Sequence, residues 1–504
     1  MSSTAATPAP ADQAAQSDAV REATVVIIGS GFGGQTAALQ LAERGVDDVV
    51  ILERRDFMGG TWCQNSYPGA AVDVQSPLYS LVGEPYRWSK MFAEQAELQE
   101  YTEHVIAKHG LREKTVTGAN VVAVRWEEEH GAWRIETEAA GTFRAQFLIN
   151  ASGPLSTPVI PPFPGREEFR GVTFHTNNWD HSVDLTGKKV AIIGSGASAA
   201  QVIPAIQPQV GELHVFQRSP HWVMPRPDRD FSAWQQRLLG IKPLYKALRT
   251  SIYWSLETRV VGFKYSDAAL KKLAQDKALK HLERQVPDPE LRAKLTPDYT
   301  IGCKRIILSN TLYPALSAPN TTLHDRTDGI DHLDATGIVT ASGEHLDLDV
   351  IVWSTGYDAT DGVISYPVVG REDRALADVW AEFPRAYLGT TVPGFPNLFV
   401  VTGPNTGIGH TSAIFVIESQ MKYVMDAIEK VRTSGRRSIE VTAQAEEDYT
   451  AMIHREMEQT VWKKGGCHSW YQSKSGHVIA MFPGFSFTFR RLAAKFKPAD
   501  HVLS

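Results

Sequence analysis

A glycine-rich stretch near the N-terminus has the residue types and spacing that allow a backbone to hold a phosphate group. It reads Gly29-x-Gly31-x-x-Gly34 and follows an apolar run that begins at Thr24. The first glycine of such a loop permits a tight turn, the second lets the backbone approach a pyrophosphate, and the third lets the next helix pack on the strand. The N-terminus of that helix then faces the anion. The stretch predicts a dinucleotide site.

An acid at the end of the next apolar run narrows the ligand of this first loop. Glu53 follows the run 49–52 and lies 24 residues after Gly29 (53 − 29 = 24). A carboxylate there accepts hydrogen bonds from ribose hydroxyls and repels a 2′-phosphate. The loop is therefore predicted to hold FAD or NAD. The alternative, a chance glycine turn in a generic α/β protein, is disfavoured because strand, helix and acid all stand in the expected order.

A second glycine-rich stretch repeats the pattern, Gly194-x-Gly196-x-x-Ala199, 165 residues later (194 − 29 = 165). Arg218 stands where the acid would be, 24 residues after Gly194 (218 − 194 = 24), and Ser219 follows it. A guanidinium and a hydroxyl suit a 2′-phosphate, so this loop is predicted to hold NADPH. The alternative is a solvated surface arginine. Three further residues of the loop and its helix are expected to contact the dinucleotide: Ser195, Ser198 and Gln201.

The two loops together restrict the chemistry. A chain that holds FAD and NADPH at separate sites passes a hydride from the nicotinamide to the flavin. Disulfide reductases of this kind need a pair of redox cysteines beside the flavin. The chain has only Cys63, Cys303 and Cys467, with no Cys-x-x-Cys pair. We therefore expect no disulfide and a reducing compartment, and dioxygen becomes the favoured electron acceptor.

Each loop belongs to a strand–turn–helix–strand unit, which pairs parallel strands. The predicted fold class is α/β, with two doubly wound dinucleotide-binding (Rossmann-like) domains. Helical spacing after Phe231 predicts a helical insertion in the second domain, and apolar runs at 349–353 and 397–401 predict strands, the later one in the first domain. The predicted boundaries are a disordered tail 1–23, an FAD-binding domain 24–155 and 391–504, and an NADPH-binding domain 156–390 with the insertion at about 231–300.

Composition disfavours several other classes of protein. The 504 residues, 43% of them hydrophobic, suffice for two or three domains with buried cores. A net charge of −6 argues against nucleic acid as a partner. The sequence has no cluster of cysteines and histidines with the spacing of a metal site. No apolar run approaches the roughly 18 residues of a membrane span. We expect a cytoplasmic protein without membrane association.

A longer motif precedes the second glycine loop. Residues 169–180 fit Phe-x-Gly-x-x-x-His-x-x-x-Trp-[Pro/Asp] at every specified position, and the chain thereby resembles the type I Baeyer–Villiger monooxygenases, which are class B flavoprotein monooxygenases. Residues 59–73 resemble a second signature of that family, and the resemblance covers about 24–491. Residues 403–412 resemble the flavin-proximal loop of the 4-hydroxyacetophenone-type branch.

The resemblance implies roles for individual residues. Arg305 matches the active-site arginine of the family, with Asp73 as its partner, and Lys304 is expected to hold the 2′-phosphate beside Arg218. A fixed guanidinium stabilises the negative charge that develops when oxygen attacks a carbonyl. The plain alternatives are a solvated arginine and a turn-capping aspartate. The resemblance also implies cofactor contacts for Gly60, Thr61, Trp62, Asp73, Tyr79, Val121 and Trp470.

Two positions qualify the resemblance. The family often has arginine two residues before the aspartate, where this chain has Ala71. Any role of that arginine in the family does not carry over to this chain. His175 lies within the motif at 169–180 and is expected to be a hydrogen-bonded hinge outside the chemistry.

The expected reaction is insertion of one oxygen atom next to a ketone carbonyl, giving an ester or lactone, with sulfoxidation as a side activity. The expected partners are therefore a small ketone or sulfide and dioxygen. Two alternatives stay open. One is a flavin monooxygenase acting mainly on sulfides or amines, and the other is an NADPH oxidase or a degenerate binding fold.

Overall fold

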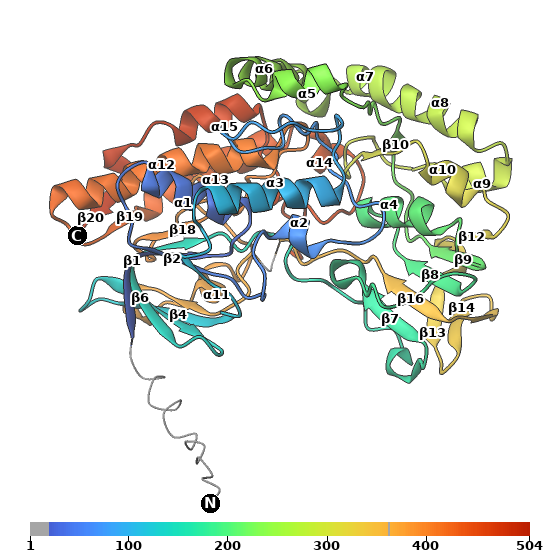
Figure 1. Ribbon diagram of the computed structural model, residues 1–504, viewed down its shortest axis with the longest axis horizontal. Helices are drawn as coiled ribbons and strands as arrows, with labels where there is room; N and C mark the ends of the chain where they lie inside the picture. The colour runs from blue at the N-terminus through green and yellow to red at the C-terminus, as the bar shows by residue number, and fades with distance from the viewer. Residues whose placement is uncertain (1–19, 361–362) are drawn as a thin grey trace, which may run out of the picture.

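The computed structural model describes residues 20–360 and 363–504 (Figure 1). Strand β1 (Arg21–Ile28) begins inside the predicted tail 1–23, so that prediction extended too far. The rest of the tail, residues 1–19, lies outside the described residues.

The first sheet has the strand order β17-β4-β5-β6-β1-β2-β3, with β18 paired to β6. Strand β1 runs parallel to β2 and β6, and β18 runs parallel to β6, which confirms that the apolar run 397–401 returns the chain to this sheet. The return begins earlier than residue 391, because β17 already pairs with β4. The other strands are β2 (Val49–Leu52), β3 (Thr115–Val116), β4 (Val121–Glu127), β5 (Ala132–Thr137), β6 (Thr142–Asn150), β17 (Val368–Val369) and β18 (Leu398–Val400).

Helices cover this sheet because its central strands are apolar on both sides. Val25, Val26 and Ile27 of β1 are fully buried, as is typical of a parallel strand between two layers. Helices α1 (Phe32–Ala42) and α12 (Ala413–Ser434) pack on one face, where Met421 and Val424 of α12 join the core of β1. Helices α3 (Gln95–Lys108) and α13 (Ala443–Met457) lie near them.

The second sheet has the order β12-β9-β8-β16-β7, and every adjacent pair is parallel. Its strands are β7 (Val172–His175), β8 (Lys189–Ile193), β9 (Glu212–Phe216), β12 (Thr321–His324) and β16 (Val350–Trp353). Strand β16 confirms the run 349–353. Helices α4 (Ala197–Ile206) and α10 (Leu312–Leu316) bury its apolar face. The two sheets together form the predicted α/β architecture.

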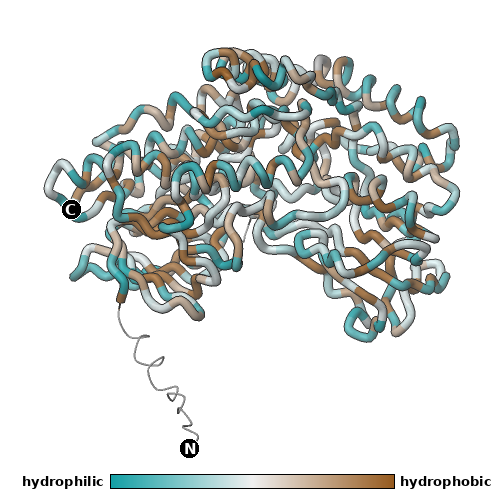
Figure 2. The backbone as a smooth tube through the Cα atoms, viewed as in Figure 1, coloured by the Kyte–Doolittle hydropathy of each residue, from teal (hydrophilic) through white to brown (hydrophobic). Residues whose placement is uncertain are grey.

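Helices occupy the range expected for the insertion, and Figure 1 shows them along the upper edge of the molecule. They are α5 (Ala233–Leu239), α6 (Lys242–Glu257), η3 (Val261–Tyr265), α7 (Asp267–Leu270), η4 (Lys271–Gln275), α8 (Asp276–Gln285) and α9 (Pro289–Lys294). Apolar and polar residues alternate along them in Figure 2. Among residues 20–360 and 363–504, no helix has the length and apolarity to cross a membrane.

The remaining elements are short or peripheral. They are α2 (Thr61–Gln64), β10 (Val223–Met224), β11 (Ile307–Leu308), β13 (Ile330–Leu333), β14 (Gly337–Thr340), β15 (His345–Asp347), α11 (Leu376–Val379), β19 (Ile439–Val441), α14 (Val461–Lys464), α15 (Ser486–Ala493), β20 (His501–Leu503) and five 3-10 turns, η1 (Arg166–Glu168), η2 (Thr176–Asn178), η5 (Arg326–Asp328), η6 (Arg371–Asp373) and η7 (Pro498–Asp500).

The expectation of no disulfide was wrong. Cys303 and Cys467 are bonded across a sequence separation of 164, and Cys63 is free. Both segments meet in a buried apolar cluster with Tyr299 and Ile301, which brings the thiols together. The bond ties the loop after the helical insertion to the segment after α14, and it removes the cysteine argument for a reducing compartment.

The glycine of the second loop generates a test of the strand–turn–helix geometry. Gly194 has φ +120, and a Cβ there would lie 2.2 Å from the carbonyl oxygen of Ser354. We expect Gly194→Ala to lower the free energy of unfolding by about 2–4 kcal/mol, because the backbone must shift.

Gly196 is the matched control, since a Cβ there has nothing within 4 Å. Gly196→Ala should stay within about 0.5 kcal/mol of the parent. Thermal unfolding of the two variants by circular dichroism compares them, and equal melting temperatures would contradict the geometry.

The disulfide generates a second test. The purified chain, denatured without reductant, should release one reactive thiol, and three after reduction. Cys303→Ser should lower the free energy of unfolding by about 2–4 kcal/mol, because the unfolded chain loses a long-range constraint. Cys63→Ser should leave the bond in place. A thiol titration that finds three free groups in the unreduced protein contradicts the pairing.

Candidate functional site

The first glycine loop is shaped by close backbone approaches. Gly29 has φ +103, and a Cβ on Gly34 would lie 2.0 Å from the carbonyl oxygen of Gly29. Helix α1 begins after Gly31 without a side-chain cap and without an acid in its first turn. Its leading backbone N–H groups therefore face outward to an anion, as a pyrophosphate site requires.

Glu53 is placed where the sequence predicts it. It directly follows β2 and is 7% exposed, and its Oε2 accepts hydrogen bonds from the backbone N–H and the hydroxyl of Ser30 at 3.0 and 2.7 Å. Ser30 lies inside the glycine loop, so the carboxylate is held against it. This arrangement leaves Oε1, which accepts from the N–H of Arg55, at the outer side of the loop.

An aromatic wall lies next to this loop. A Cβ on Gly60 would be 2.7 Å from the Cα of Gly31, so α2 starts in contact with the loop. The rings of Trp62 and Tyr79 meet edge to face at 5.8 Å, and Phe32 lies 5.9 Å from Tyr79. Burial raises the pKa of Tyr79 to about 12, so this phenol stays a hydrogen-bond donor at neutral pH. Thr61 begins α2 and is exposed.

The second loop has the same form in the second sheet. Helix α4 begins after Gly196, again uncapped and without an acid in its first turn, and Ala199 is fully buried against the strands. The hydroxyl of Ser195 donates to the carbonyl of Ser219 at 3.1 Å. Ser198 is half-buried in the first turn of α4. The N–H groups of this turn form a second anion site.

Two cations stand beside the second loop. Lys304 donates to the hydroxyl of Ser219 at 2.7 Å, and its ammonium lies 4.8 Å from the ring of Tyr299. Burial, with the nearby charge of Arg218, lowers the pKa of Lys304. Arg218 is exposed. Two cations that repel each other are stabilised by an anion between them, so this pair suits a phosphate.

An ion pair joins the two halves of the chain. Arg305 donates from Nε and Nη2 to Oδ2 of Asp73, at 2.9 and 2.6 Å, across 232 residues of sequence. The Asp73 carboxylate raises the pKa of Arg305. Both side chains are about one-third exposed, 31% and 36%. The guanidinium is therefore fixed as a cation by one carboxylate oxygen and still open on one side.

Residues that sequence reasoning missed surround this pair. Tyr471 is 2% exposed, and it interacts electrostatically with Arg305, as does Tyr79. Burial, together with the charge of Arg305, lowers the pKa of Arg259, two residues after α6. Tyr471 adjoins the predicted Trp470, which is 47% exposed with its ring 4.5 Å from that of Tyr471. The resemblance singled out Trp470, whereas its buried neighbour Tyr471 is the residue that interacts with Arg305.

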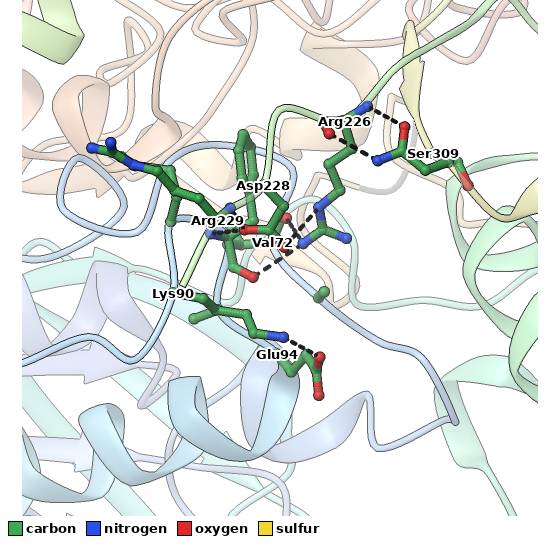
Figure 3. Close-up of polar contacts among 12 residues, drawn as sticks. Val72, Lys90, Glu94, Arg226, Asp228, Arg229 and Ser309 are labelled. Atoms are coloured by element: carbon green, nitrogen blue, oxygen red, sulfur yellow. Dashed lines mark hydrogen bonds and ion pairs between the residues drawn. The ribbon is translucent and has the colours of Figure 1, made fainter. Parts of the chain in front are cut away.

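Arg226 was also missed, and it holds the backbone beside Asp73. Its Nη2 donates to the carbonyl oxygens of Val72 and Phe92 at 3.3 and 3.1 Å, and its guanidinium lies over the ring of Phe92 at 5.1 Å (Figure 3). Asp228 is 3.7 Å from its Nε and accepts from the N–H of Phe92. A side chain that binds main-chain carbonyls leaves no sequence motif, so only the fold reveals it.

Several predicted residues have mainly protein partners. The side-chain amide of Gln201 donates to the carbonyl of Ala71 at 2.8 Å and accepts from the hydroxyl of Tyr67 at 3.0 Å, so it joins α4 to the first half of the chain. Ala71 thus contributes a backbone acceptor two residues before Asp73. Val121 opens β4 and is buried.

The motif at 169–180 lies at the junction of the two sheets. His175 ends β7, and its Nδ1 accepts from the N–H of Asn177 at 3.0 Å. Burial lowers the pKa of His175 to about 4, so the ring is neutral at physiological pH. The carbonyl of Asn177 accepts from the side chain of Gln64 at 2.5 Å. These contacts agree with a hinge and place His175 away from the Asp73–Arg305 pair.

The site fits two dinucleotides. Among the described residues, the buried polar atoms without a protein partner include those of Gln35 and Trp62 near the first loop and Ser354 beside Gly194. Such atoms cost about 1–3 kcal/mol each unless a ligand or water satisfies them. Together with two uncapped helix N-termini, they indicate a site built around bound groups, with the Asp73–Arg305 pair between the two loops.

Comparison with known proteins identifies the family. Residues 23–242 match a family model described as pyridine nucleotide-disulphide oxidoreductase. A Baeyer–Villiger monooxygenase of Pseudomonas aeruginosa is 43% identical over 96% of this chain and 92% of that protein. One of Streptomyces coelicolor is 42% identical over 95% of this chain and 92% of that protein.

Solved structures agree. An oxidised steroid monooxygenase bound to NADP is 31% identical with a TM-score of 0.84, over 96% of this chain and 99% of that one. Cyclohexanone monooxygenase from Rhodococcus sp. Phi1, bound to NADP+, is 28% identical with a TM-score of 0.86, over 96% of this chain and all of that one. With two curated relatives above 40% identity over nearly its full length, the chain belongs to the Baeyer–Villiger monooxygenase family.

Proposed function

We propose that the chain is an FAD-containing, NADPH-dependent Baeyer–Villiger monooxygenase that converts a small ketone to an ester or lactone. The observation that carries this proposal is the fixed, partly open Arg305 guanidinium between two dinucleotide loops. Family membership supports the reaction class. The first glycine loop with Glu53 would hold FAD, and the second with Arg218, Ser219 and Lys304 would hold NADPH.

The proposed domains follow the two sheets. The FAD-binding part comprises the first sheet with its returning strands, and the NADPH-binding part comprises the second sheet with the helical insertion. FAD held by the first loop and NADPH held by the second would supply the redox chemistry of such a monooxygenase. The protein positions the reactants and stabilises charge.

Arg305 is proposed to stabilise the oxyanion that develops on the ketone oxygen when the carbonyl carbon is attacked. A donor preorganised for such an oxyanion contributes roughly 10²–10³ in rate. Asp73 orients the guanidinium through both hydrogen bonds to Oδ2. Arg226 in turn holds the Val72 carbonyl next to that aspartate. The neighbouring phenols of Tyr79 and Tyr471 exclude water from this side of the pair.

A sulfide substrate remains the second candidate. Sulfur is a soft nucleophile without a carbonyl oxyanion, so its oxidation would not need Arg305. The open side of the guanidinium therefore favours ketones. A cytoplasmic location, expected from the sparse cysteines, stays a prediction, and the Cys303–Cys467 bond weakens the argument for it.

Product analysis with heavy-isotope dioxygen tests the function. The purified protein with NADPH and a panel of linear, cyclic and aryl ketones plus a thioether should give an ester that carries one labelled oxygen atom. Mass spectrometry detects the label. Hydrogen peroxide as the sole oxygen product across the panel would contradict the proposal and indicate an oxidase, whereas sulfoxide alone would favour the second candidate.

Arg305→Ala in the same assay separates the oxygen-insertion step from flavin reduction. Ester formation should fall by roughly 10²–10³-fold, while reduction of the flavin by NADPH survives. Sulfoxidation, which has no oxyanion to stabilise, should fall less than ester formation.

A further inference from the structure

The outer face of the helical insertion carries large apolar side chains. They lie on α5, on α6 and on the short turn between them, and Figure 1 shows the two helices along the upper edge of the molecule. Their exposed fractions are far above those of a core: Trp234 62%, Leu238 39%, Ile241 46%, Leu244 47% and Trp254 54%. We call these five residues the insertion patch. Contiguous exposed apolar groups of this size mark interaction sites on soluble domains.

Helical spacing places the outer residues of α6 on one side of that helix. Leu244, Ala247, Ser251 and Trp254 of α6 are three, four and three residues apart, so they share one side of the helix. The opposite side is buried: Tyr245, Ile252 and Leu256 pack in an apolar cluster that also contacts Trp62 and Tyr79 of the candidate site. Phe487, at the start of α15, extends the outer surface, with its ring 5.9 Å from that of Trp254.

The patch is held rigidly by ion pairs on the inner side. Arg249 of α6 pairs with Glu418 of α12 at 3.0 Å. Glu257, at the end of α6, is 2% exposed and accepts from the hydroxyl of Ser486 at 2.8 Å, and His410 lies 3.1 Å from the same oxygen. These contacts use the only acid between Phe231 and Tyr265. The outer face consequently has no acid of its own.

Exposed cations lie on the same two helices as the patch. Arg237, Lys242 and Lys246 are exposed on α5 and α6, although the whole chain carries a net charge of −6. Helices that lie in the interface of an anionic bilayer have a similar composition: they combine Trp and Leu with Lys and Arg and have few acids. Lysine and arginine near such a surface strengthen the attachment.

We propose that the insertion patch docks this protein on the surface of a membrane containing anionic lipids. The indole rings would enter the headgroup region, and Arg237, Lys242 and Lys246 would contact lipid phosphates. A second copy of the chain fits less well. A two-fold contact would bring two copies of this face together, with cations on both sides and no acid from either to offset their repulsion. This proposal differs from the expectation, drawn from the sequence, that the protein has no membrane association.

Vesicle co-sedimentation of the full chain tests the proposal. The protein should bind vesicles of mixed phosphatidylcholine and phosphatidylglycerol, bind pure phosphatidylcholine far less, and dissociate from the mixed vesicles at high salt. Trp234→Ser with Trp254→Ser removes the apolar anchors, and Lys242→Glu with Lys246→Glu reverses the charge. Each pair should weaken binding by about tenfold or more.

The matched control is Lys188→Glu with Arg326→Glu, two exposed cations away from the insertion, which should bind like the parent. Circular dichroism confirms that every variant folds. Equal binding to both kinds of vesicle, or patch variants that bind like the parent, would overturn the proposal. So would a dimer in vesicle-free sedimentation velocity that the tryptophan variants dissociate, because the patch would then be a contact between copies.

Discussion

The contact between Asp73 and Arg305 is the constraint on which the rest of the site depends. It joins a segment that follows the first glycine loop to one that follows the helical insertion, so it requires both sheets to be in place. A guanidinium held from one side by a carboxylate has its remaining donors directed outward. This is the arrangement that stabilises an oxyanion without reorganisation during the reaction.

Other contacts position the two partners. Arg226 and Gln201 bind the carbonyls of Val72 and Ala71 and thereby hold the backbone before Asp73. On the other side, the Cys303–Cys467 bond fixes the loop that carries Arg305 to the segment that carries Tyr471. The aspartate and the arginine are thus each anchored through main chain or disulfide from the opposite half of the fold. The helical insertion adds its inner face to the same cluster, while its outer face is free to meet another surface.

Features that depend on neighbouring residues were predictable from the sequence. The glycine loops, Glu53 and the strands at 349–353 and 397–401 are local patterns, because turn geometry and strand burial are set within a few residues. The Asp73–Arg305 pair was predicted only from the resemblance to the monooxygenase family, because no periodicity links positions 232 residues apart.

Most of what sequence reasoning missed involves contact partners that are distant in the chain. The disulfide spans 164 residues, and an odd number of cysteines argued against it. Arg226 acts on carbonyl groups, which every residue has, so its type and spacing carry no signal. The early return of the chain at β17 involves a strand of two residues, too short for an apolar run to reveal. Trp470 is exposed and Tyr471 is buried. The sequence did not show which of these two neighbours lies beside Arg305, because burial depends on the fold.

A double-mutant cycle on Asp73 and Arg305 tests the central claim most directly. Asp73→Asn, Arg305→Lys and the double variant would be compared by the rate of ester formation in a single turnover. If the aspartate acts by orienting the guanidinium, the second change adds little to the first, with a coupling of about 1–3 kcal/mol. Effects that multiply independently would show that the two residues act separately, and would contradict the account.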